Sequence, residues 1–210
     1  MTSGKHFATV IFALALCLTA ALTPRAWALP AVQNGDIIFQ VSRSAQSLAI
    51  QQATGSRYSH MGIIFFRNDK PYVFEASGKV KYTPLQDWID RGEQKHIVVK
   101  RMKNAGQVLT PAALSAMRKQ AQRFAGKPYD LRFSWSDERL YCSELVWKIY
   151  DRALKVKIGE RQKVREFHLH APAVKQKLYE RYGANIPLDE WVISPGAMFA
   201  SPLLITVASE

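Results

Sequence analysis

Apolar residues along this chain follow two different periods, and each period predicts a different kind of element. Short, strongly apolar runs bounded by turn-forming residues are typical of strands. Such runs occupy 36–42, 59–66, 72–77 and 96–102. Only the polar stretch "RNDKP" separates the second run from the third, and so short a connection predicts a tight antiparallel hairpin.

Other segments repeat their apolar residues at helical spacing and carry helix start and stop residues. The predicted helices occupy 44–55, 83–92, 110–126, 142–154 and about 171–182. Ser44, Thr83 and Thr110 are the expected N-caps, and the two threonines precede a first-turn proline. Because strands and helices are interspersed, we expect an α+β fold in which helices pack a mostly antiparallel sheet.

The first 28 residues are predicted to be a signal peptide. A short basic start precedes the apolar run 7–22, which is too short to span a bilayer comfortably. The small residues of "AWA" at 26–28 have the spacing that a signal peptidase recognises. An uncleaved anchor is the alternative, and both features disfavour it. We therefore expect a mature domain at 29–210, in the periplasm or secreted.

The charge balance predicts an anionic neighbour. Cleavage would remove Lys5 and Arg25 and lower the formal net charge from +12 to +10. Phospholipid headgroups and cell-wall polymers are anionic partners that an exported protein meets. Nucleic acid is not expected, because the basic runs at 79–82 and 161–165 are separated and carry little aromatic interleaving.

Cys142 is the only cysteine left once Cys17 departs with the signal peptide, so no internal disulfide is possible. An odd cysteine in an exported chain is a buried spectator, an intermolecular link or a reactive thiol. Burial statistics favour the spectator. The predicted position at a helix start favours the reactive thiol, because unpaired N–H groups there stabilise a thiolate and an oxyanion.

A cysteine nucleophile needs a base and a group that orients the base. With a two-residue loop at 68–69, Glu75 faces Gly62, two residues from His60 on the same side of the sheet. Their Cβ atoms are then expected about 7 Å apart or somewhat less. A one-residue slip would place Glu75 on the opposite face. His60 and Glu75 are therefore the candidate base and carboxylate.

Other kinds of chemistry have weaker signals. Cys142, His60 and Glu75 share no ligand-type spacing, and "HLH" at 168–170 has no third ligand nearby, so neither a metal nor another cofactor is expected. No glycine-flanked serine elbow is present. Four aromatic residues precede the cysteine helix and either line a cleft or belong to the core: Tyr129, Phe133, Trp135 and Tyr141.

The order of motifs resembles a known family. "GDIIFQVSRS", "YSHMGIIF", "VFEA" and "YCSELVWKIY" are similar, in that order, to motifs of the YiiX-like permuted papain-fold cysteine hydrolases, within the NlpC-type peptidase superfamily. The resemblance extends through "KPYD" and "ISPGAMF", nearly the whole predicted mature chain. It implies a circularly permuted papain-like fold, because the histidine and carboxylate motifs come before the cysteine helix.

The resemblance also implies roles: Cys142 as nucleophile, His60 as general base and Glu75 as the residue that orients the imidazole. We therefore expect an exported cysteine amidase or peptidase acting on a cell-wall peptide or related small peptide. A hydrolase or acyltransferase acting on acyl lipids is the nearest alternative. An inactive fold kept as an envelope-binding module is the alternative from another class.

Overall fold

The computed structural model describes Met1 and residues 31–210, so the predicted signal-peptide cleavage site lies outside the described residues. Its centre is a six-stranded sheet with the order β4-β3-β2-β1-β5-β8, in which every pair of neighbours is antiparallel. The strands are β1 (Ile37–Ser42), β2 (His60–Arg67), β3 (Lys70–Ser77), β4 (Lys79–Pro84), β5 (Gly92–Met102) and β8 (Leu204–Ser209). The mostly antiparallel sheet expected from the sequence is confirmed.

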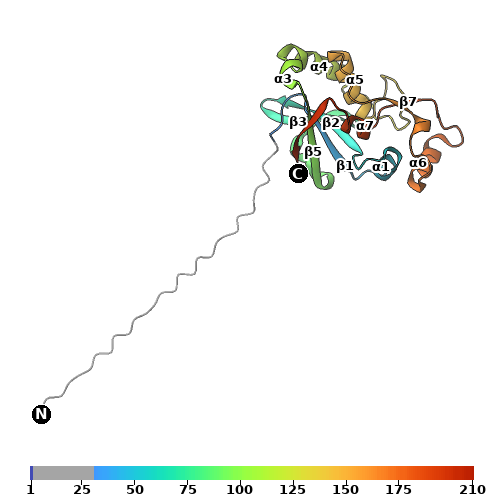
Figure 1. Cartoon of the computed structure of the whole chain (residues 1–210), viewed down its shortest axis with the longest axis horizontal. Helices are drawn as coiled ribbons and strands as arrows, with labels where there is room; N and C mark the ends of the chain where they lie inside the picture. Colours follow the sequence, from blue (N-terminus) through green and yellow to red (C-terminus); the bar gives the residue numbers. More distant parts are fainter. Residues whose placement is uncertain (2–30) are drawn as a thin grey trace.

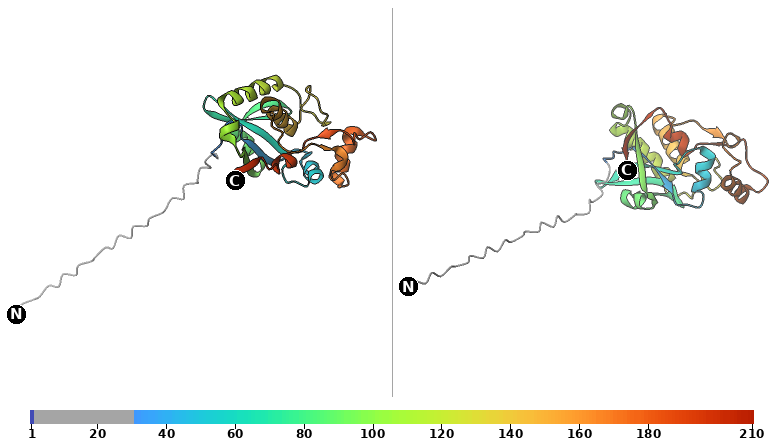
Figure 2. Two further views of the ribbon diagram at one scale, coloured as in Figure 1. Left: turned by 45° about the horizontal axis from the view of Figure 1, so that its top comes forward. Right: turned by 60° about the horizontal axis from the view of Figure 1, so that its bottom comes forward.

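Helices cover the sheet and extend one end of the molecule (Figure 1). They are α1 (Ser47–Thr54), α2 (Leu85–Asp90), α3 (Ala105–Val108), α4 (Pro111–Phe124), α5 (Cys142–Leu154), α6 (Pro172–Tyr182) and α7 (Pro195–Phe199), with a 3-10 turn, η1 (Val164–Glu166). A small ribbon pairs β6 (Gln162–Lys163) with β7 (Trp191–Val192). Helices α1 and α6 lie side by side at that end (Figures 1 and 2). No helix in the described part of the chain is long and apolar enough to cross a membrane.

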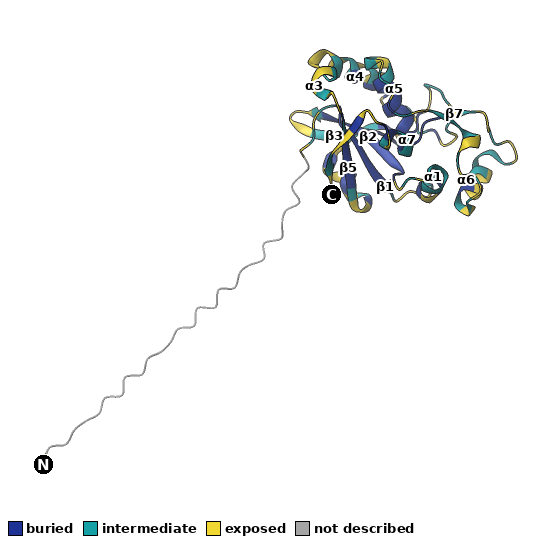
Figure 3. Ribbon diagram, viewed as in Figure 1, coloured by how far each residue is buried: buried dark blue, intermediate teal, exposed yellow. Residues whose placement is uncertain are grey.

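Alternating side chains bury both faces of the sheet. Odd-numbered residues such as Phe39 and Ile63 join one core with α4 and α5, whereas Ile38 and Ile64 join a second core with Trp88 of α2. Helix α5 is buried along most of its length, and Figure 3 shows it in the same dark blue as the central strands. The start of α5 is therefore held rigidly against the sheet.

The hairpin between β2 and β3 has the predicted register. Arg67 pairs with Lys70, and Ile63 pairs with Phe74. The two loop residues have positive φ angles, 47° at Asn68 and 58° at Asp69. Such angles at both central positions define the turn that matches the natural twist of a two-residue hairpin.

Two predicted helix starts are wrong. Helix α1 begins at Ser47 with Gln46 as its N-cap, because the Ser44 hydroxyl instead accepts a hydrogen bond from Ser42. Residues 79–84 form strand β4, and α2 has Pro84 as its N-cap without a side-chain hydrogen bond. Thr83 pairs with Val73 in the sheet, so its hydroxyl is directed to a sheet neighbour and caps no helix.

Candidate active site

Cys142 is the first residue of α5, as the sequence predicted. The preceding residue, Tyr141, is extended, and its backbone N–H donates to Glu144 Oε2 over 3.4 Å, which fixes the first turn of the helix. Cys142 is a free cysteine that is only 3% exposed, and it lines a pocket. Its side chain therefore lies beside the unpaired N–H groups of a helix N-terminus and has access to a hollow.

His60 and Glu75 come from neighbouring strands and are in direct contact. His60 is the first residue of β2 and Glu75 lies near the end of β3. The imidazole Nε2 is 2.6 Å from Glu75 Oε2, and the two residues are 9% and 0% exposed. The contact that the hairpin register predicted is present.

Three further residues bind Glu75, and the sequence did not reveal them. Thr83 donates its hydroxyl to Oε1 over 2.6 Å, and Trp88 donates its indole N–H to Oε2 over 3.0 Å. The Arg91 guanidinium also donates to Oε2. Trp88 additionally stacks on the His60 ring, with 5.8 Å between ring centroids. Strand β4 and helix α2 thus hold the carboxylate and the imidazole in one orientation.

The pKa values follow from this arrangement. Burial alone would raise the pKa of Glu75. The hydrogen bond from His60 and the positive charges of His60 and Arg91 outweigh burial and lower this pKa to about 2. Burial alone would lower the pKa of His60, but interactions with the Cys142 side chain and with Glu75 raise it to about 9. The imidazolium is therefore stabilised between the Cys142 side chain and the Glu75 carboxylate.

The structure thus brings Cys142, His60 and Glu75 together from α5, β2 and β3. The Cys142 side chain lies near enough to raise the pKa of His60, and the imidazole Nε2 contacts Glu75. A thiol, an imidazole and a carboxylate brought together in this way can activate the thiol for attack on a carbonyl. The order along the chain is histidine, carboxylate, cysteine.

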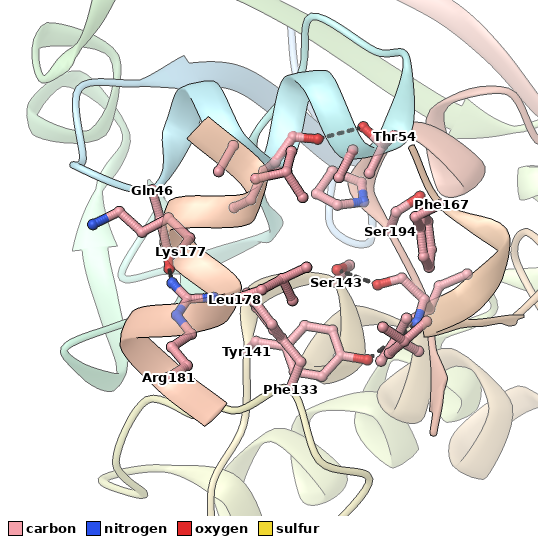
Figure 4. Close-up of a pocket in the computed structure, with 18 of the residues that line it drawn as sticks. Gln46, Thr54, Phe133, Tyr141, Ser143, Phe167, Lys177, Leu178, Arg181 and Ser194 are labelled. Atoms are coloured by element: carbon pink, nitrogen blue, oxygen red, sulfur yellow. Dashed lines mark hydrogen bonds between the residues drawn. The ribbon is translucent and has the colours of Figure 1, made fainter. Parts of the chain in front are cut away.

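A predominantly apolar pocket opens beside Cys142 (Figure 4). Its walls come from α1, α6, the 164–169 segment and residues 192–195. Three of the four aromatic residues before α5 line it, namely Tyr129, Phe133 and Tyr141, whereas Trp135 packs on Trp147. The pocket encloses roughly 820 Å³ of space, part of it open to solvent.

One end of this pocket is polar. Gln46 donates to the Tyr129 hydroxyl over 2.8 Å and accepts from Arg181 over 2.5 Å. Figure 4 shows Gln46, Lys177 and Arg181 at this end, with Phe167 and Ser194 at the other. Burial is the main cause that raises the pKa of Tyr129, and the nearby Cys142 side chain raises it further, so the Tyr129 hydroxyl keeps its proton. This polar end continues into a second hollow that contains His60.

The other histidines within residues 31–210 lie elsewhere. His168 and His170 are exposed in the segment before α6, and His96 stacks on Tyr58. Within residues 31–210, no three histidine, cysteine or acidic side chains are placed to hold a metal ion.

Comparisons with known proteins show what this chain is similar to. A family model described as permuted papain-like amidase enzyme, YaeF/YiiX, C92 family, matches residues 31–208. The protein YiiX of Escherichia coli (strain K12) is 53% identical over 197 residues, which cover 94% of this chain and 95% of that protein. A crystal structure described as metalloprotein yiiX from Escherichia coli O157:H7 is 57% identical, with a TM-score of 0.81, and the match covers 85% of this chain and 97% of that one. The chain belongs to the permuted papain-like amidase family.

Proposed function

We propose that this protein is a cysteine hydrolase that cleaves an amide bond through Cys142, His60 and Glu75. The observation that carries the proposal is that the Cys142 thiol, at the start of α5, lies beside the His60–Glu75 pair, in which the imidazole Nε2 is 2.6 Å from the carboxylate. Membership of an amidase family supports the reaction class.

In the proposed reaction, His60 already holds the proton that Cys142 gives up, in line with its raised pKa, and the sulfur attacks the amide carbonyl carbon. Backbone N–H groups at the start of α5 receive the oxyanion. The C–N bond then breaks, and His60 gives its proton to the departing amine, leaving a thioester on Cys142. Water, deprotonated by His60, attacks the thioester and releases the acid. Glu75 keeps the imidazole oriented and stabilises its charged form throughout.

The pocket beside Cys142 favours an apolar acyl group on the substrate. Residues such as Ile50, Phe167 and Leu178 would bury an alkyl or aromatic acyl chain, and each buried methylene contributes about 0.8 kcal/mol. This lining supports an acyl-lipid or acyl-amide substrate over the polar cell-wall peptide that the export signal alone favoured. The inactive binding module has no comparable support.

The proposed reaction needs only protein groups and water. The relative from Escherichia coli O157:H7 is described as a metalloprotein. The described residues of this chain do not offer the three clustered ligands that a stable site needs. The carboxylate of Glu75 is already bound by four donors from protein side chains.

We also propose that the chain is exported after cleavage between Ala28 and Leu29, and that an anionic envelope surface attracts it. Mass spectrometry of the protein recovered from the periplasm or the medium tests the cleavage. A mature mass that begins at Leu29 supports it, and an intact amino terminus in a membrane fraction contradicts it.

Replacement of Cys142 by serine tests the catalytic proposal. N-octanoyl-glycinamide and purified cell-wall fragments serve as substrates, and released amine is measured. We expect at least a thousandfold loss of turnover, because a serine hydroxyl is a far weaker nucleophile in a site built for a thiol. Mass spectrometry of the native protein should trap an octanoyl thioester on Cys142. Activity that survives Cys142→Ser, with unchanged thermal unfolding, would refute the assignment.

A further inference from the structure

The hollow that contains His60 is lined by an excess of basic side chains. Five basic residues line it and only one carboxylate does, Glu180. We call this hollow the cationic hollow. Its basic residues are Arg43, Arg91, Arg139, Lys177 and Arg181. They come from the loop after β1, the end of α2, the loop before α5 and the last turns of α6.

Three of these five cations have no carboxylate partner among the described residues. Arg91 is bound to Glu75, and Lys177 is 2.5 Å from Glu180. Arg43 and Arg139 are exposed and form no ion pair with any described residue. Arg181 binds only the neutral amide of Gln46 and stacks on Phe133, 4.8 Å from the ring centroid. Uncompensated positive charge thus surrounds the His60 side of the cleft.

The two halves of the cleft meet at the reacting groups. Cys142 lines the apolar pocket and His60 lines the cationic hollow. Four residues line both and mark where the two hollows join: Gln46, Tyr129, Lys177 and Arg181. In the proposed reaction the acyl group remains on the sulfur and the amine departs with the proton from His60. The acyl group therefore belongs in the apolar pocket, and the departing amine belongs in the cationic hollow.

We propose that the departing amine carries an anionic group, a carboxylate or a phosphate, that binds to Arg43, Arg139 and Arg181. This inference rests on the proposed function, since it uses the direction of the reaction to assign the two halves of the cleft. The substrate class is then an amide between an apolar acyl group and an anionic amine. Low-dielectric walls on the apolar side strengthen the field that these cations create in the cleft.

Binding to the Cys142→Ala variant tests this inference without requiring turnover. Isothermal titration compares N-octanoyl-glycine, N-octanoyl-phosphoethanolamine and the neutral N-octanoyl-glycinamide. We expect the better anionic ligand to bind on the order of tenfold more tightly than the neutral one at about 0.1 M salt, where the Debye length is about 10 Å. At about 1 M salt, where it is about 3 Å, the ratio should approach one. The tighter of the two anions identifies carboxylate or phosphate.

Variants locate the effect. Arg43→Gln combined with Arg139→Gln should reduce the anionic-to-neutral ratio severalfold. Arg123→Gln, on an exposed position of α4 outside both hollows, should leave that ratio unchanged. Equal affinity for all three ligands, or a preference that survives the double substitution, would overturn the anion site. Turnover of the neutral amide by the native enzyme in that case would leave the proposed function standing. Anion-selective binding without turnover of any amide would instead support the anion site and contradict the hydrolase.

Discussion

Glu75 accepts hydrogen bonds from four different side chains, as many as its two oxygens can readily accept. A buried carboxylate needs partners merely to be tolerated. These partners do more, because Trp88 both donates to Glu75 and stacks on His60. The carboxylate and the imidazole therefore have a single arrangement available, and the direction of the His60 ring toward Cys142 follows from it.

Thr83 is predicted to be a positioning residue for Glu75. Thr83→Val keeps the β-branched shape but removes the donor to Oε1, which we expect to cost about 1 kcal/mol of stability. Turnover should fall severalfold with little change in KM, because Thr83 lines neither of the two hollows beside Cys142 and His60. Steady-state kinetics and urea unfolding measure both effects. Thr206→Val, at an exposed position of β8, is the matched control and should change neither. Full activity in Thr83→Val would show that the other donors suffice.

The raised pKa of His60 is predicted to depend on Glu75. In a Cys142→Ala background, Glu75→Gln should move the pKa of His60 toward 6.5 or below. Burial lowers this pKa, and neither Cys142 nor the Glu75 carboxylate then remains to raise it. Imidazole proton resonances followed against pH by NMR measure this. In the native protein the charged form of His60 contributes stability fully below pH 6.5, and the contribution is lost as pH rises through about 9. Glu93→Gln, an exposed change in β5, should leave the titration as it was, and an unaltered titration in Glu75→Gln would contradict the prediction.

The sequence could predict some of these residues because their geometry is local. His60 and Glu75 are joined by a hairpin whose two-residue loop sets the register. Thr83 could not be found in the same way. A threonine followed by proline is an equally good helix start, and only the pairing of β4 with β3 shows that its hydroxyl is directed to Glu75. Trp88 and Arg91 depend on the packing of α2, which no local pattern encodes.

At the scale of elements, the pairing of β2 with β3 depends on Gly62. A Cβ atom at this position would lie 2.4 Å from Val73 Cγ1 and 2.8 Å from the Phe74 carbonyl oxygen. Gly62→Ala must therefore push the strands apart beside His60 and Glu75. We expect a loss of about 1–3 kcal/mol of stability and a marked fall in turnover. Gly106→Ala, in α3, meets no atom within 4 Å and should be nearly neutral. Equal melting temperatures for the two variants would refute the argument.

Helix α5 carries a buried ion pair that fixes the loop before it. Lys148 Nζ is 2.7 Å from Glu144 Oε1 and 2.9 Å from Asp137 Oδ1, and it donates to the Ser136 carbonyl over 2.5 Å. These contacts connect residues 136–137 to the helix that begins at Cys142. Burial raises the pKa of Glu144 to about 7, despite the hydrogen bond from Lys148.

This pKa predicts a pH-dependent stability. Folded Glu144 retains a proton between pH 4.5 and about 7, whereas the unfolded chain has released it, so unfolding free energy falls as pH rises through that window. Glu144→Gln should remove on the order of 2–3 kcal/mol of this decline, as measured by urea unfolding at several pH values. Glu93→Gln should retain the decline. A Glu144→Gln variant with the wild-type slope would contradict the assignment.

The elements that the sequence predicted best have strong local signals. Helix α4 begins after Thr110, whose hydroxyl accepts from the Ala113 N–H, and it buries Met117, Ala121 and Phe124 on one face. The edge strands β4 and β8 were missed. Residues 79–84 are mostly polar, and 204–209 lie more than a hundred residues from their partner β5, so their pairing is a property of the whole fold.

At the scale of the whole molecule, the apolar pocket exists only because distant segments meet. Helix α1 follows the first strand, whereas α6 and residues 192–195 belong to the last fifth of the chain. Their side chains converge on the thiol at the start of α5 from opposite ends of the sequence. No local pattern could predict such a pocket, although the aromatic residues before Cys142 indicated that a cleft was possible. Substrate selection is therefore a property of the assembled chain.

A substitution that fills this pocket should separate acyl selection from catalysis. Ala53 lies on α1 and lines the pocket, so Ala53→Trp should occupy space that an octanoyl chain would use. In the native enzyme we expect kcat/KM to rise by about fourfold per methylene, from acetyl-glycine amides to octanoyl ones, until the pocket is full. Ala53→Trp should abolish most of that rise and retain turnover of the acetyl amide. Ala112→Trp, at an exposed position of α4, should preserve the native dependence on chain length. A dependence that persists unchanged in Ala53→Trp would place the acyl chain elsewhere, because the indole and the alkyl chain cannot share one volume.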